Sequence, residues 1–213
     1  MRRAVRAETG PLCGAMHRAR LRYCQGTFDM DINRIRQLLG AAPVAVFSAP
    51  QAAGLEPGDT APSFELLDQH GKLHRLSDYR GQWLVVYFYP RNDTPGCTTE
   101  ACEFRDDVVI LKRMGVALLG VSTDDVKSHQ KFAGKYHLPF ALLSDARGEV
   151  ARRYGSLMSM GPLKFAKRHT FIIDPDGRIA RIYRKVRPSE HSDRVIADLE
   201  QLGAAQTQQE SRS

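Results

Sequence analysis

Two continuous apolar runs constrain the fold of this 213-residue chain more than any other feature. The runs WLVVYFY (83–89) and VALLGVS (116–122) are rich in β-branched and aromatic residues, which is typical of strands buried on both faces of a sheet. Between them, Phe104, Val108 and Leu111 recur at spacings of four and three, as on one face of a helix. A strand, a helix and a strand in this order predict a parallel pair joined by a right-handed crossover.

The rest of the chain extends this unit into a mixed sheet. Two short strands are predicted around the turn DQHG within residues 58–81, and the hairpin HTFIIDPDGRIARIYR turns at residues 175–177. Between the apolar run at 116–122 and this hairpin we expect a helix in DDVKSHQKFAGKYHL, a strand in PFALLSD and a helix in GEVARRYG. The last element expected is a helix in SDRVIADLEQLG. The order β-β-β-α-β-α-β-α-β-β-α predicts a thioredoxin-like three-layer α/β sandwich with a mixed central sheet. The residues expected on the apolar sides of the two longer later helices are Val126, Phe132, Tyr136, Val195, Leu199 and Leu202.

Charge separates an N-terminal segment from the body of the chain. The domain is predicted over residues 55–204, with a polar tail at 205–213 and a basic extension at 1–54. Residues 1–50 carry eight arginines and three acidic residues, so most of the net charge of +7 lies there and the body is close to neutral. Charge therefore does not support a nucleic-acid surface on the body. No apolar run approaches the roughly 18 residues that a membrane span needs.

The N-terminal segment allows two interpretations. Residues 30–54 contain two arginines, an apolar run and then small residues, which resembles a secretory signal with cleavage near Ala53. The alternative is an Ala/Pro-rich linker on a solvated tail, so we expect a cytoplasmic protein, with export to the periplasm as the alternative. Cys13, His17 and Cys24 are too loosely placed in this Arg-rich stretch to favour a metal site, and a redox role for either cysteine stays open.

Cys97 and Cys102 are the two cysteines of the body, and their spacing limits what they do. If both lie in the first turns of one helix, the side chains are about 7.5 Å apart along the axis and about 140° apart around it. A disulfide needs Cα atoms within about 7 Å and converging side chains, so the folded helix cannot hold one. Zinc sites use shorter spacings and further ligands, which the neighbouring sequence lacks. Small buried side chains and reactive thiols remain as interpretations.

The position of Cys97 favours reactivity. It follows Gly96 at an expected helix start, in a loop at the carboxyl end of a central strand, where free backbone N–H groups and the helix dipole favour a thiolate. The Pro95-Gly96 turn lets the backbone approach a small polar ligand. Thr94 either places a hydroxyl beside the thiolate or serves only as a local cap, and Thr98 or Thr99 is expected to cap the helix.

The stretch YFYPRNDTPGCTTEACEFRD resembles the peroxiredoxins of the bacterioferritin comigratory protein, or Q-type, subgroup. Pro90, Thr94 and Cys97 match the family signature Pro-x-x-x-Thr-x-x-Cys, and Cys102 matches the second cysteine that often follows five residues later. The resemblance covers roughly residues 55–202, including GDTAPSFEL and RHTFIIDPDGRI, and implies the peroxiredoxin fold.

This resemblance implies a role for each matching residue. Cys97 would be the peroxidatic cysteine, which attacks a hydroperoxide and becomes a sulfenic acid. Thr94 would bond to the thiolate and the peroxide, and Pro90 would shield the pocket. Arg168, three residues before Phe171 in the Thr-Phe-x-Ile-Asp strand, would stabilise the thiolate and the departing oxygen. Glu100 would orient this arginine, and Lys167 is a weaker candidate for the cationic role.

The resemblance also implies how the enzyme is recycled. Cys102 would be the resolving cysteine, and thioredoxin would reduce the Cys97–Cys102 disulfide by thiol exchange. No flavin, haem or metal is needed, and a monomer or weak homodimer is expected. The segment GSLMSMGPLKFAKRHTF is more apolar and basic than the family pattern suggests, and we expect a loop that alters peroxide preference or dimer contacts. The alternatives are a thioredoxin-fold redox sensor or partner-binding protein without turnover, and a tail that binds nucleic acid or a membrane surface.

Overall fold

The computed structural model describes residues 54–161 and 163–204. The predictions for residues 1–53, among them the signal-like segment and the Cys13, His17 and Cys24 group, lie outside the described residues, as does the tail at 205–213. The strands are β1 (Glu65–Leu67), β2 (Leu73–Arg75), β3 (Trp83–Phe88), β4 (Val116–Ser122), β5 (Ala141–Ser144), β6 (Leu157–Met160), β7 (Leu163–Ala166), β8 (His169–Ile173) and β9 (Ile179–Tyr183). The helices are α2 (Pro95–Arg113), α3 (Val126–Tyr136), α4 (Glu149–Arg153) and α5 (His191–Gln201), with 3-10 turns η1 (Leu76–Tyr79) and η2 (Pro188–Glu190).

The central sheet has seven strands in the order β2-β1-β5-β4-β3-β8-β9. β3, β4 and β5 are parallel, and β8 pairs antiparallel with the other side of β3. Every residue of β3 and β8 is buried, as the continuous apolar run at 83–89 predicted for a strand covered on both faces. The mixed sheet and its central βαβ crossovers are therefore confirmed.

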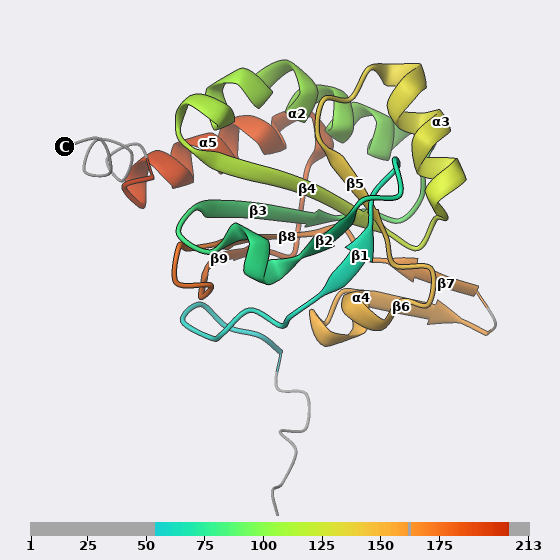
Figure 1. The fold of residues 1–213 in the computed structure, drawn as a ribbon, viewed down its shortest axis with the longest axis horizontal. Helices are drawn as coiled ribbons and strands as arrows, with labels where there is room; N and C mark the ends of the chain where they lie inside the picture. Colours follow the sequence, from blue (N-terminus) through green and yellow to red (C-terminus); the bar gives the residue numbers. More distant parts are fainter. Residues whose placement is uncertain (1–53, 162, 205–213) are drawn as a thin grey trace, which may run out of the picture. The chain divides into compact units, whose positions relative to one another are not determined.

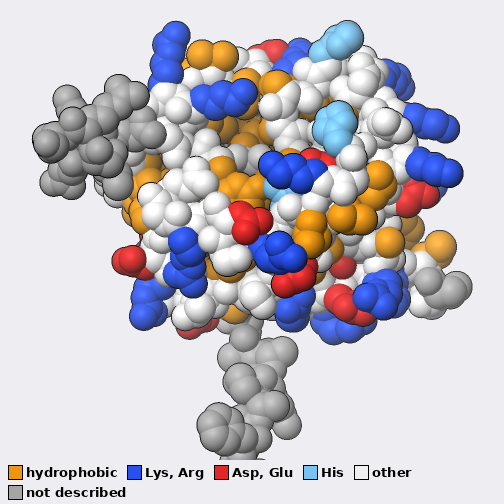
Figure 2. All heavy atoms as spheres, in the orientation of Figure 1, with side chains coloured by type: hydrophobic (Ala, Val, Ile, Leu, Met, Phe, Trp, Pro, Cys, Tyr) orange, Lys and Arg blue, Asp and Glu red, His pale blue; other side chains and the backbone are white. Residues whose placement is uncertain are grey.

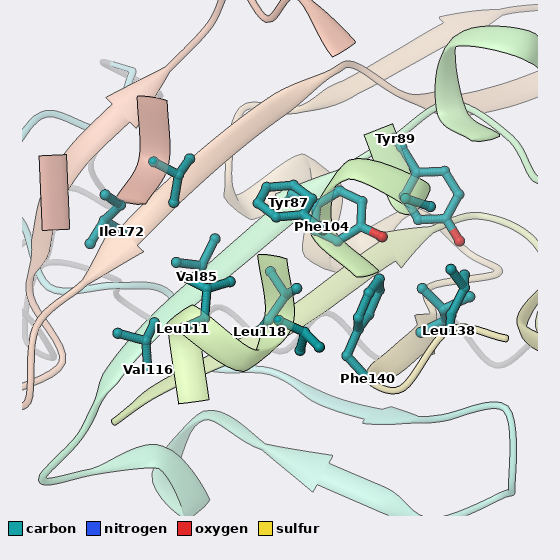
Figure 3. Close-up of a cluster of buried hydrophobic side chains, with 14 of the residues drawn as sticks. Val85, Tyr87, Tyr89, Phe104, Leu111, Val116, Leu118, Leu138, Phe140 and Ile172 are labelled. Carbon is teal, nitrogen blue, oxygen red and sulfur yellow. The ribbon is translucent and has the colours of Figure 1, made fainter. Parts of the chain in front are cut away.

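Side chains alternate across β3 into two separate cores, which makes the three layers (Figure 1). Tyr87 and its odd-numbered neighbours pack against α2, α3 and α5, whereas Val86 and its even-numbered neighbours face α4 and the segment before β3. On the first side the ring of Tyr87 lies 5.0 Å from that of Phe104 and 6.2 Å from that of Phe140 (Figure 3). These aromatic contacts seat α2 against the end of β3 from which the chain enters the helix.

Helix α2 begins earlier than the sequence suggested. It starts at Pro95 with Thr94 as its N-cap residue, so the expectation of a cap at Thr98 or Thr99 was wrong. Proline at the first helical position has its φ angle already set and needs no donor there, which favours this start. Cys97 is consequently the third residue of the helix.

The segment expected to be a loop is a second small sheet. β6 and β7 pair antiparallel from Leu157 opposite Ala166 to Met160 opposite Leu163. Gly161 has a φ of 60°, in the left-handed region that a tight turn requires. Most of this hairpin is exposed, so no alternation of apolar and polar residues marked its strands.

The face of the molecule drawn in Figure 2 shows no concentration of one charge. On the face drawn in Figure 2, basic and acidic side chains lie interspersed, with apolar side chains between them. Within the described residues, no helix is long and apolar enough to cross a membrane. Within the same residues, no group of three His, Cys, Asp or Glu side chains is placed to hold a metal ion.

Candidate active site

Cys97 lies where the chain leaves the central strand and enters α2. β3 ends at Phe88, the loop 89–94 follows, and the first turn of α2 places the thiol against the end of the sheet. The Cys97 side chain is 1% exposed and the thiol is free. A cysteine here meets the unpaired backbone N–H groups of a helix start, which favour the thiolate form.

Arg168 reaches this thiol from a distant part of the sequence. Residue 88 of β3 pairs with His169 of β8, so the residue preceding β8 lies beside the loop that leaves β3. Arg168 Nη2 donates a hydrogen bond to Cys97 Sγ at 3.2 Å, and Nη1 donates to Glu100 Oε2. One guanidinium thus bridges the sulfur and a carboxylate one helical turn further along α2.

Burial sets the electrostatics of this cluster. The Glu100 side chain is fully buried, and burial raises the pKa of its carboxyl to about 7, although the charge and hydrogen bond of Arg168 act in the opposite direction. Burial by itself would lower the pKa of Arg168, but the Glu100 carboxylate and the Cys97 sulfur outweigh it and raise that pKa. Arg168 is therefore a permanent cation in contact with the Cys97 sulfur and the Glu100 carboxyl.

The backbone around Arg168 is fixed by the start of the β6–β7 hairpin. The Lys167 N–H donates to the Ser156 carbonyl at 2.6 Å, and the Ser156 hydroxyl bonds to His169 Nδ1 at 3.0 Å. These contacts flank Arg168 on both sides. The Lys167 side chain is exposed, and the structure places Arg168 rather than Lys167 on the thiol.

Gly96 makes room for the guanidinium. A Cβ atom at this position would lie 3.2 Å from Arg168 Nη2 and 3.7 Å from Pro188 Cγ. The first distance is tighter than ordinary van der Waals contact, so a larger residue would press on the arginine that contacts Cys97. The structure therefore gives Gly96 a steric reason to be a glycine.

The other predicted residues lie close to Cys97 in the chain, in the loop before α2 or on α2 itself. Pro90 is half-buried and lines a cavity of about 250 Å³ together with Arg91, Thr123, Asp124, Leu163, Lys164 and Phe165. The Thr94 hydroxyl donates to the carbonyl of Arg91 at 3.1 Å, so its bond to the thiolate and the peroxide stays a prediction. Cys102 is free and half-buried on the same helix as Cys97.

A buried network that the sequence did not reveal holds the loop before Cys97. Asn92 accepts a hydrogen bond from the Tyr89 hydroxyl at 2.8 Å and donates to Ser128 Oγ at 2.9 Å and His129 Nδ1 at 3.1 Å. Its backbone N–H donates to Asp124. Asn92 occupies one of the unspecified positions of the Pro-x-x-x-Thr motif, so spacing carried no sign of its role.

The next residue of this loop has an unusual backbone conformation. Asp93 has a φ of 57°, in the left-handed region, and its carboxylate pairs with Lys135 of α3 at 2.7 Å. Asp tolerates this region better than most residues because its short polar side chain bonds locally. The loop is thus attached to α3 through both Asn92 and Asp93.

Comparison with known proteins identifies this arrangement. Residues 57–182 match the AhpC/TSA family, and a putative peroxiredoxin bcp of Coxiella burnetii is 42% identical over 149 residues, covering 68% of this chain and 99% of the relative. The chain belongs to the peroxiredoxins of the AhpC/TSA family. Peroxiredoxin Bcp of Bacillus subtilis is 39% identical over 156 residues, covering 70% of this peroxiredoxin and 97% of the relative.

A solved structure supports the same placement. The bacterioferritin comigratory protein of Xanthomonas campestris, studied for alkyl peroxide reduction, has a TM-score of 0.62 and 33% identity, covering 70% of this peroxiredoxin and 98% of that chain. The resemblance read from the stretch at 87–106 is thereby confirmed, together with the thioredoxin-like fold.

Proposed function

We propose that Cys97 is the nucleophile of this thiol peroxidase, that it reduces hydrogen peroxide and organic hydroperoxides, and that Cys102 resolves the oxidised form. The observation that carries this proposal is the Arg168 guanidinium held between the buried Cys97 sulfur and Glu100. A thiolate paired with a fixed cation at a helix start is an activated nucleophile.

The first step transfers one oxygen atom. The Cys97 thiolate bonds to the terminal oxygen of the peroxide, the O–O bond breaks, and the remaining oxygen leaves as an alkoxide or hydroxide that takes up a proton. Cys97 is oxidised to a sulfenic acid, and the peroxide is reduced to an alcohol or water. The positive charge of Arg168 stabilises both the thiolate and the negative charge that develops on the leaving oxygen.

The second step requires α2 to open. Cys97 and Cys102 lie five residues apart in one continuous helix, whose geometry separates their side chains by about 140°. The helix start is suited to unwinding, because Thr94 makes no side-chain cap hydrogen bond and the first turn contains no acidic residue. Once the turn has opened, Cys102 attacks the sulfenic sulfur, water leaves and a disulfide forms.

A dithiol protein of the thioredoxin type is the proposed reductant. One of its thiolates attacks the disulfide and its second thiol releases the mixed disulfide, so two electrons return Cys97 and Cys102 to the free state. The family resemblance supports this partner, and it also supports a monomer or weak homodimer.

Two substitutions test the assignment. In an assay with thioredoxin, its reductase and NADPH, Cys97→Ser should consume no peroxide. In the same assay, Cys102→Ser should reduce one equivalent of peroxide and then stop, because thioredoxin cannot recycle it. Mass spectrometry of the unmodified protein after one equivalent of peroxide should locate a Cys97–Cys102 link, with Cys13→Ser and Cys24→Ser as matched controls that keep turning over.

Several outcomes would count against the proposal. Normal turnover by Cys102→Ser would remove the resolving role, and a link from Cys97 to either N-terminal cysteine would overturn the pairing. A single stoichiometric burst by the unmodified protein would indicate a redox sensor in place of an enzyme.

A further inference from the structure

Two groups that form anions share one cation in the interior of the site. Cys97 is 1% exposed and Glu100 is fully buried, and both bond to the same guanidinium, that of Arg168. Among the residues that the structure describes, no second ion pair to Glu100 is found. The thiolate and the carboxylate therefore depend on a single positive charge.

Buried charge makes the fully ionised cluster unfavourable. A thiolate, a carboxylate and one guanidinium leave a net charge of −1 in a site from which water is largely excluded, and an unpaired buried charge is costly. One proton on either the sulfur or the carboxyl makes the cluster neutral. The charge on the sulfur and the charge on the carboxyl therefore depend on one another through Arg168.

Among the described residues, Arg168 is the one cation that contacts both Glu100 and Cys97. From β3, Tyr87 faces Glu100 and Cys97, and burial raises its pKa far above neutrality, so its hydroxyl is neutral; the same holds for Tyr89. From α5, His191 lies near Arg168, and burial lowers its pKa to about 4, so its ring is neutral too. Arg194 of α5 is charged and acts on His191, whereas Arg168 is the charge that acts on Glu100. The charge balance of the contacting groups therefore rests on Cys97, Glu100 and Arg168.

The second carboxyl oxygen of Glu100 supports a neutral form. In the described part of the chain, Glu100 Oε1 is buried without a hydrogen-bond partner, whereas Oε2 is bonded to Arg168. A carboxylate oxygen left without a donor is expensive to bury, and protonation removes most of that expense. Burial also raises the pKa of Glu100 to about 7, which puts its titration in the working range.

We propose that Glu100 holds the proton that Cys97 gives up, and that this proton returns when the peroxide is cleaved. The proposal rests on the proposed role of Cys97 as the nucleophile. In the reduced enzyme the thiol proton moves to the Glu100 carboxylate, giving a thiolate, a neutral carboxylic acid and the Arg168 cation.

The proton that the leaving oxygen needs then comes from within the site. The thiolate bonds to the terminal peroxide oxygen, the O–O bond breaks, and the departing alkoxide accepts a proton as Glu100 reverts to a carboxylate. The products are the neutral sulfenic acid, an alcohol and the Glu100–Arg168 ion pair. No proton is drawn from solution during the oxidation.

Proton uptake separates this role from simple orientation of Arg168. The assay follows Cys97 oxidation by one equivalent of hydrogen peroxide in weak buffer at pH 6.5, below the pKa of Glu100, with a pH indicator. It uses full-length Cys102→Ser protein so that the reaction stops at the sulfenic acid. Thiolate absorbance should disappear with no net proton uptake, whereas the added Glu100→Gln substitution should draw about one proton per Cys97. Glu103→Gln, the same change three residues along α2, is the matched control and should behave like its parent.

The opposite results would overturn the proposal. If Glu100 only orients Arg168, the parent protein takes up about one proton and Glu100→Gln changes the rate without changing that count. An absence of thiolate absorbance in the reduced parent would also overturn it.

A second measurement does not depend on the folding of a Glu100 variant or on peroxidase activity. Infrared spectra of the reduced protein at pH 6.5 should contain the carbonyl stretch of a buried carboxylic acid, and Cys97→Ser should lack it because no thiolate then competes for Arg168. An unchanged spectrum in Cys97→Ser would refute the coupling. Because no peroxide is used, failure of the peroxidase assignment would leave this test valid.

Discussion

Replacing Gly96 with alanine should stabilise the fold and slow the chemistry at the same time. Gly96 is the second residue of α2, and alanine favours a helical position over glycine by about 0.5–1 kcal/mol. The new Cβ would lie 3.2 Å from Arg168 Nη2, the atom that donates to Cys97 Sγ. The same methyl group thus helps the helix and disturbs the guanidinium.

The size of the kinetic effect follows from how Arg168 is held. Its Nη1 is bonded to the buried Glu100, so the guanidinium cannot move aside freely, and the Nη2 contact with sulfur is the one that must lengthen. A hydrogen bond to a charged group is worth about 1.5–3 kcal/mol. Because about 1.4 kcal/mol corresponds to a tenfold change in rate, loss of this bond should slow Cys97 oxidation by about 10- to 100-fold.

The assay compares Gly96→Ala with Gly134→Ala. Gly134 lies in α3 and a Cβ atom there would meet nothing within 4 Å, so its substitution adds helix propensity without touching the site. Urea unfolding should show both variants stabilised by about 0.5–1 kcal/mol. Stopped-flow oxidation by hydrogen peroxide should be slowed only in Gly96→Ala.

A Gly96→Ala variant that is stabilised like Gly134→Ala and oxidised at the unmodified rate would refute the reasoning. The Arg168–Cys97 contact would then contribute nothing to the reactivity of the thiol. A loss of stability in Gly96→Ala would instead show that the helix, and not the guanidinium, gives way to the added methyl group.

Two further predictions concern the buried polar groups around the site. Asn92→Ala removes the side-chain bonds to Tyr89, Ser128 and His129 and should lower the free energy of unfolding by about 2–3 kcal/mol in urea; a loss below about 1 kcal/mol would contradict the anchoring role. Burial, with the nearby arginines, lowers the pKa of His191 to about 4. Between about pH 6.5 and 4 the unfolded state therefore binds one proton more than the folded state. The free energy of unfolding should fall by about 3 kcal/mol as the pH drops through that window. His191→Gln should lack this fall relative to the unmodified protein, the exposed His70→Gln should keep it, and equal slopes in all three would refute the assignment.

The sequence predicted the central sheet well because burial leaves a direct mark on composition. β3 and β4 are continuous apolar runs, and α2 carries its apolar residues at helical spacing, so their types and order were readable without any tertiary information. The β6–β7 hairpin left no such mark, since most of its residues are exposed and neither face is consistently apolar. Its pairing is visible only in three dimensions.

In the site, too, the sequence revealed only the residues that lie close together in the chain. The Cys97 neighbourhood was readable because a helix start, Pro95-Gly96 and two cysteines lie within one short stretch. The part contributed by Arg168 depends on the antiparallel pairing of β3 with β8, which no local pattern reveals. Arg168 itself was singled out by the family resemblance. Asn92 could not have been singled out, because its importance comes from Tyr89, just after β3, and from two residues of α3 that only the folded chain brings close to it.

Oxidation of Cys97 should itself loosen the helix that hides it. Before the reaction Arg168 bonds to a thiolate, and charge-assisted hydrogen bonds are roughly twice as strong as neutral ones. Afterwards the sulfenic acid is neutral, and under the proposed proton transfer Arg168 is paired with Glu100, which has become a carboxylate. The free energy that held the first turn of α2 closed is therefore reduced by the chemical step, and this turn has no side-chain cap hydrogen bond to compensate. Peroxide reduction removes the negative charge from the sulfur of Cys97, and the same loss of charge helps to expose Cys97 to Cys102.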